Sequence, residues 1–136
     1  MTIFSAIGIA GTGATVHRKW LDAVSDNIAN VNTARASDEA AYQEKRVLVE
    51  AVDYGAGTGG VRVAGAVNAS SAEGRMVYEP DHPLADDDGY VRYPDIDLSS
   101  QMSQMIMAQR GYQANLAVVD RARETYLAAL RIGSGG

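Results

Sequence analysis

Residues 3–31 read IFSAIGIAGTGATVHRKWLDAVSDNIANV, and the seam positions recur along them at alternating steps of four and three. A repeat that averages 3.5 residues aligns these side chains along one side of an α-helix, as in a coiled coil. The stretch therefore predicts a helix of about 30 residues and roughly 45 Å. Its two rows, in which only His17 is not apolar, are Ile7, Ala14, Leu21 and Ile28, and Ile3, Ala10, His17, Val24 and Val31.

The C-terminal segment shows the same period and predicts a second long helix. Asp97 and Ser99 are its two candidate N-caps, because their side-chain oxygens can accept from free backbone amides. The run GSGG at residues 133–136 predicts its end. The sequence leaves open whether the two helices pack antiparallel on each other or on neighbouring subunits. The two rows of this segment are Leu98, Met105, Tyr112, Val119 and Tyr126, and Met102, Gln109, Leu116, Arg123 and Leu130.

The middle of the chain has the features of short strands. Valines alternate along residues 61–67, and residues 47–49 and 75–79 are further β-prone runs. The glycine-rich residues 55–60 predict a loop, and the pair Asp88-Gly89 predicts a turn. The fold class that follows is α+β, with long terminal helices and a small β-rich insert.

The domain organisation follows from this order of elements. Residues 1–33 and 98–136 are expected to form one discontinuous helical assembly domain. Residues 34–97 form an insert of extended loops and strands, with the strands within 42–97. Because both helices end near the insert, we expect it to project away from them.

Composition excludes several classes of protein. The 136 residues suit one modest domain, and the net charge of −5 argues against a general nucleic-acid binder. There are no cysteines, so disulfides and thiolate metal sites are excluded. The apolar N-terminus lacks a basic region and is interrupted by glycines, which makes it a poor cleavable signal and too short a membrane span.

No motif predicts catalysis, a cofactor or a metal. The glycines at 55, 57 and 60 spell G-x-G-x-x-G, but a strand-like run follows where a nucleotide site needs a helix. Residues 86–88 are three consecutive aspartates, whereas calcium ligands alternate along their loop. His17 and His82 have no partner at a catalytic spacing, and His17 is expected at an interface or in solvent.

Glycines and amides on the predicted helices are more informative. Four glycines lie inside them, and each costs about 0.5–1 kcal/mol relative to alanine. Such helices are marginal alone and suit segments that become ordered on packing with partners. A buried amide on a helical seam can fix register, whereas Gln113 could equally be exposed and Asn30 could equally belong to a helix-end turn. The glycines are Gly8, Gly11, Gly13 and Gly111, and the amides are Asn27, Asn30, Asn32, Gln113 and Asn115.

Two segments that contain these amides resemble signatures of flagellar rod and hook proteins. SDNIANVNT at 25–33 is similar to the N-terminal S-x-N-[LI]-A-N-x-x-T, and RGYQANL at 110–116 to the C-terminal R-x-Y-Q-A-N. LRIG at 130–133 resembles the usual ending. VYEPDHPLAD at 77–86 resembles a further block, V-Y-E-P-x-H-P-x-A, that narrows the likeness to a proximal-rod subunit. One departure is Gly111, where serine or alanine is more usual, which would loosen the helix.

The resemblance implies a structural subunit of the flagellar basal-body rod, which crosses the periplasm and carries torque. It implies export without a cleaved signal through the flagellar type III apparatus, and terminal helices that line a hollow tube. The implied partners are copies of the chain, other rod proteins, the membrane-ring adaptor and the export apparatus, with no nucleic acid and no small-molecule substrate.

The expected assembly residues combine the apolar rows and the amides. Two other classes are weighed against a rod subunit: a small adaptor or binding module with a closed coiled coil, and an acid-dependent enzyme using the acids of residues 86–97, which lacks a partner group. The expected interface is Ile7, Ala14, Leu21, Val24, Asn27, Ile28, Asn30, Met102, Met105, Tyr112, Gln113, Asn115, Leu116, Val119, Tyr126 and Leu130.

Overall fold

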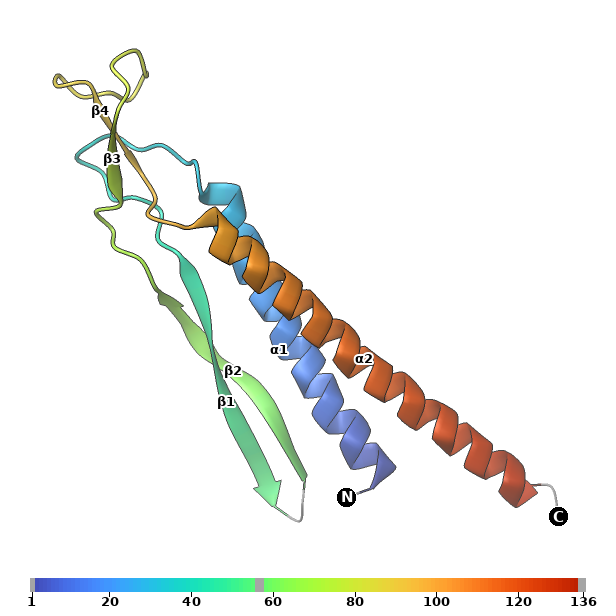
Figure 1. Cartoon of the computed structure of the whole chain (residues 1–136). Helices are drawn as coiled ribbons and strands as arrows, with labels where there is room; N and C mark the ends of the chain where they lie inside the picture. Colours follow the sequence, from blue (N-terminus) through green and yellow to red (C-terminus); the bar gives the residue numbers. More distant parts are fainter. Residues whose placement is uncertain (1, 56–57, 135–136) are drawn as a thin grey trace.

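The computed structural model describes residues 2–55 and 58–134, which form two long helices and two β-hairpins (Figure 1). This arrangement confirms the α+β fold class. The elements are α1 Ile3–Asn30, β1 Lys45–Gly55, β2 Thr58–Asn68, β3 Arg75–Tyr78, β4 Tyr90–Tyr93 and α2 Leu98–Ser134.

Each helix begins at a side-chain cap. Thr2 and Ser5 form a capping box at the start of α1, where each side chain bonds the other residue's backbone amide. Of the two candidates for α2, Asp97 is the N-cap, because its carboxylate accepts from the amides of Ser99 and Ser100 at 3.1 and 3.3 Å. α2 continues through Gly133 to Ser134, two residues into the GSGG run that was predicted to end it, and residues 135–136 lie outside the described part of the chain.

The β1–β2 hairpin is longer than the sequence predicted. Its strands pair antiparallel from Lys45–Asn68 to Gly55–Thr58, so Thr58, Gly59 and Gly60 belong to a strand and not to a loop. Gly60 faces α1: a Cβ there would lie 2.5 Å from the Thr12 hydroxyl oxygen, which accepts from the Val61 amide at 3.1 Å. The glycine therefore allows close contact between strand and helix.

The hairpin does not project away from the helices, as the sequence analysis expected. β1 and β2 run back along α1 towards the chain termini, and only β3 and β4 lie beyond the opposite end of the helices (Figure 1). The molecule is consequently elongated. The prediction failed because it treated the insert as one unit, whereas Gly60 and Thr12 allow its first hairpin to dock on α1.

The second hairpin is tied to the segment after α1 by one arginine. Arg92 pairs with Arg35 through two backbone bonds of 2.8 and 3.0 Å, and its guanidinium donates to the carbonyls of Ser37 and Glu73. The predicted turn at Asp88-Gly89 is confirmed, and Gly89 has a φ of 82°, which favours glycine. The second hairpin thus has a defined position at the end of the helices.

Acid should open the loop that joins β3 and β4. Asp86 accepts from the amides of Tyr90 and Asp88 at 2.8 and 3.1 Å, and the bond from Tyr90 is the main reason that the pKa of Asp86 is lowered. A lowered pKa means that this stabilisation is fully present above the unfolded value of 3.8 and is lost as the pH falls below it. We expect the protection of the Tyr90 amide against hydrogen exchange, relative to its intrinsic rate, to fall in that range. Asp86→Asn should lower this protection at neutral pH, whereas equal protection in Asp86→Asn and Asp87→Asn would contradict this role.

Candidate assembly interface

α1 and α2 pack antiparallel along a seam of direct contacts. At the end near the termini, the rings of Phe4 and Tyr126 lie 5.3 Å apart. Further along, the Trp20 indole donates to the side-chain oxygen of Gln104 at 3.3 Å. The sequence left two packings open, and within this chain the helices pack on each other.

Beside the half-buried Met105, Tyr112 and Val119, a row of smaller and more polar residues of α2 lies towards α1. We call Gln101, Ala108, Asn115 and Ala122 the inner row: Gln101 and Ala108 are buried, and the other two are half-buried. We call the predicted row Met102, Gln109, Leu116, Arg123 and Leu130 the outer row, and all five of its residues are exposed. The two rows differ by one residue, which is a rotation of about 100° around the helix.

A buried amide cluster fixes the end of the seam near β1. The Asn27 side chain is 1% exposed and donates to Gln101 Oε1 at 2.9 Å and to the Lys45 carbonyl at 3.0 Å. Its oxygen accepts from the Lys45 amide at 2.8 Å and from the Tyr42 hydroxyl at 3.2 Å. Burial raises the pKa of Tyr42, which keeps that hydroxyl protonated as a donor. Asn27 thus connects α1, α2 and β1 with every hydrogen-bonding position used.

Two glycines provide space for polar side chains in the middle of the seam. A Cβ on Gly13 would lie 2.5 Å from Asn115 Oδ1, and a Cβ on Gly111 would lie 2.2 Å from His17 Nε2. His17 Nδ1 lies 2.8 Å from the Gly13 carbonyl, and Asn115 Nδ2 donates to the Gly111 carbonyl at 2.8 Å. Gly111 therefore has a packing role beside the expected loosening of the helix, because its missing side chain is the space that the His17 ring fills.

The remaining expected residues divide between the seam and the surface. Asn30 closes the end of α1, donating to the Asp26 carbonyl and accepting from Thr33, which is the helix-end role considered for it. Gln113 is exposed, so its amide does not contribute to the seam. Half-buried or buried residues are Ile7, Ala14, Leu21, Val24, Ile28, Met105, Tyr112 and Val119. Exposed apolar residues are Met102 (55%), Leu116 (40%), Tyr126 (39%) and Leu130 (51%).

Comparisons with known proteins agree over nearly the whole chain. A family model described as "Flagellar basal body rod FlgEFG protein C-terminal" matches residues 87–132. The chain is 35% identical to the flagellar basal-body rod protein FlgC of Salmonella typhimurium, with 98% of this chain and 99% of the relative covered. The FlgC proteins of Borreliella burgdorferi and Bacillus subtilis are 34% and 27% identical at 99% and 98% coverage of this chain, and 100% and 99% of their own lengths. The chain belongs to the FlgC family of flagellar basal-body rod proteins. It is therefore a structural protein of the basal-body rod.

Three of the four motifs that carry the likeness to the FlgC family have separate positions in the fold. The N-terminal motif contributes Asn27 to the amide cluster, and the C-terminal motif contributes Gly111 and Asn115 to the seam. The block at 77–86 forms the turn region of the second hairpin, where the Tyr93 hydroxyl donates to Glu79 at 2.9 Å. Much of each motif therefore has a role within the chain.

Sequence reasoning missed two seam residues of this FlgC-family chain. Ala108 is fully buried, and Gln101 is as buried as Asn27. The available signal was their spacing of seven, which also includes Asn115 and Ala122. It was overlooked because the neighbouring outer row is more apolar.

Proposed function

We propose that this chain is a subunit of the proximal rod that polymerises helically through α1 and α2 and transmits torque across the periplasm. The observation that carries the proposal is the exposed outer row of α2, in which Met102, Leu116 and Leu130 are 55%, 40% and 51% exposed. A second row at heptad spacing is what a helix needs to pack on a further helix. Contacts of this kind that do not close into a ring generate a helical filament.

The exposed area of the chain supports this proposal. The structure exposes 8829 Å² for a mass of 14.4 kDa, whereas a compact monomer of that mass exposes about 6,800 Å². The difference of roughly 2,000 Å² per subunit is comparable to the area that each subunit would bury in two standard interfaces. Most of the buried apolar side chains among the described residues are alanine or valine, so the chain has a small core of its own.

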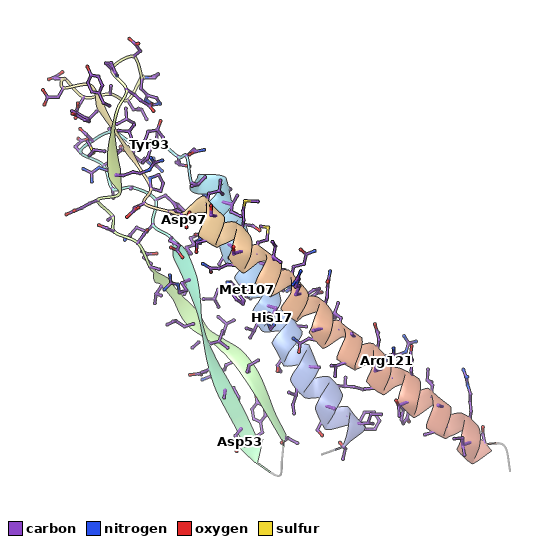
Figure 2. All side chains as sticks on the ribbon, viewed as in Figure 1. His17, Asp53, Tyr93, Asp97, Met107 and Arg121 are labelled. Atoms are coloured by element: carbon purple, nitrogen blue, oxygen red, sulfur yellow. The ribbon has the colours of Figure 1, made fainter. Side chains whose placement is uncertain are left out.

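The C-terminal end of α2 is a second exposed apolar surface of the described chain. Because Phe4 lies opposite Tyr126 and α1 begins at Ile3, residues 127–134 extend past α1 (Figure 1). Within this overhang Leu127, Leu130 and Ile132 are 41%, 51% and 83% exposed. Figure 2 shows Arg121 on this half of α2, far from Tyr93 in the second hairpin. An apolar overhang suits contact with a subunit further along the filament.

The proposal includes the domain division, the partners and the location. Residues 1–33 and 98–136 form the assembly domain, and residues 34–97 add lateral contacts that resist twisting. The partners are copies of this chain, other rod proteins, the membrane-ring adaptor and the export apparatus, and no enzymatic activity is assigned. The chain reaches the periplasm without a cleaved signal. Neither α1 nor α2, as far as each is described, has the length and apolar character needed to cross a membrane.

Trypsin should cut the free chain first in the overhang. Arg131 lies in the exposed last turns of α2, whereas Arg18 lies on the part of α1 that packs on α2 and the first hairpin. Proteases act on segments that open easily, so cleavage at Arg131 should precede cleavage at Arg18. Mass spectrometry of timed digests measures the order. In isolated basal bodies Arg131 should be protected, whereas equal cleavage in free and assembled protein would contradict assembly through the overhang.

Cross-linking within basal bodies tests the partners directly. The chain has no cysteine, so a single cysteine at Met102 provides a unique attachment point on the outer row. We expect a photoactivatable maleimide at this site to join the chain to another copy or to another rod protein. Recovery of only uncross-linked subunit from intact rods would contradict the proposed use of this row.

A further inference from the structure

We infer that His17, Gly111, Gly13 and Asn115 act as a register lock, which holds the inner row of α2 against α1 and keeps the outer row facing neighbouring subunits. The inference rests on the proposed use of the outer row in assembly. It assigns these four residues a positioning role, since none of them would touch the neighbouring subunit through the outer row.

The need for a lock follows from the two rows of α2. The inner row contains two amides and two alanines, whereas the outer row carries Gln109 and Arg123 beside its three large apolar residues. Apolar burial would favour Met102 and Leu116 over the two amides at the seam, because a buried Leu or Met side chain gains about 1.5–3 kcal/mol over an exposed one. A rotation of α2 by one residue would turn Met102 and Leu116 towards α1 and away from a neighbour. Packing at the polar positions of the inner row must therefore help to select the observed rotation.

Size complementarity across the seam supplies this selection. His17 fills the space above Gly111, and Asn115 fills the space above Gly13, so each helix contributes one large polar residue and one glycine. A rotation of α2 would move both glycines away from the side chains that they accommodate. Interiors are packed closely enough that such a mismatch costs about as much as overpacking a core.

Hydrogen bonds prevent the two polar side chains from simply turning aside. The Gly13 carbonyl can only accept, so the 2.8 Å contact requires that His17 Nδ1 carries the proton and donates. Asn115 Nδ2 is likewise committed to the Gly111 carbonyl, and it therefore only lies beside His17 Nδ1 at 3.4 Å. Each polar side chain is thus bonded to the glycine carbonyl of its own helix while it covers the glycine of the other helix.

Reciprocal substitution tests the lock. In Gly111→Ala the new methyl group would overlap the His17 ring, so we expect the observed rotation to be disfavoured by roughly ten- to hundredfold. His17→Ala in the same chain removes the overlap and should restore the rotation. Gly11→Ala is the matched control, because an added Cβ meets nothing within 4 Å.

Disulfide formation reports the rotation without requiring a rod. In purified full-length protein, cysteines replacing Phe4 and Tyr126 should cross-link faster than cysteines replacing Phe4 and Leu127, because the first pair is in contact. Gly111→Ala should shift this ratio towards the second pair by about tenfold. The double variant with His17→Ala should return the ratio to that of the starting protein. The control Gly11→Ala should leave the ratio unchanged. An unchanged ratio in Gly111→Ala, or a defect that His17→Ala does not relieve, would overturn the lock.

Swarming of cells that carry these variants as their only copy then connects the lock to assembly. Gly111→Ala should swarm poorly, and addition of His17→Ala should restore swarming. If the disulfide ratio responds as expected and swarming does not, the lock is retained and the use of the outer row in assembly is refuted.

Discussion

Replacing Leu116 with aspartate should abolish rod assembly and motility while leaving the rest of the fold intact. Leu116 is 40% exposed in the outer row, so the substitution costs little in the free chain. In the rod the same carboxylate would be buried against a neighbouring helix without a partner. The penalty for such a charge is several kcal/mol per interface, and it would apply to every subunit. We expect non-swarming cells and basal bodies that end before the rod.

The controls for this prediction separate assembly from folding. Leu116→Met keeps an apolar side chain of similar volume and should swarm normally. Purified Leu116→Asp should retain the far-UV circular dichroism of the unsubstituted chain, because the inner row still faces α1. Normal motility in Leu116→Asp cells would show that the outer row does not contact neighbours.

Helix positions could be predicted from the sequence because their physical basis is local. The 3.5-residue period located α1, and side-chain chemistry limited the cap of α2 to two candidates, of which Asp97 is the cap. The turn at Asp88-Gly89 was predicted for the same reason, since glycine alone tolerates the positive φ at that position. None of these features depends on residues far away in the sequence.

The orientation of α2 and the place of the first hairpin depend on long-range fit, which periodicity does not contain. Hydrophobicity ranks Leu116 above Asn115 as a seam residue, whereas the space above Gly13 accommodates Asn115. Gly60 similarly reads as a loop residue until Thr12 is seen beside it. In both cases the deciding feature is the absence of a side chain, and a sequence read for apolar residues gives it no weight.

Asn27→Ala should produce the largest loss of stability, because one side chain satisfies groups from three elements. The substitution leaves the Gln101 amide buried without its partner and removes the bonds to both backbone groups of Lys45. An unsatisfied buried polar group costs about 1–3 kcal/mol, so the total loss should be about 3 kcal/mol. Urea titration followed by the fluorescence of Trp20, the only tryptophan, measures the free energy of unfolding.

Asn30→Ala is the matched control for this prediction, since it removes the same side chain three residues later on α1. Its amide bonds the Asp26 carbonyl at 2.8 Å in a solvent-exposed position, so water can replace it and the loss should stay below about 1 kcal/mol. Asn27 lies in the motif shared with rod proteins, and a large loss only at Asn27 would assign that part of the motif to folding. Equal losses in the two variants would instead mean that the buried cluster does not hold α1, α2 and β1 together, and the orientation of α2 would then depend on the register lock alone.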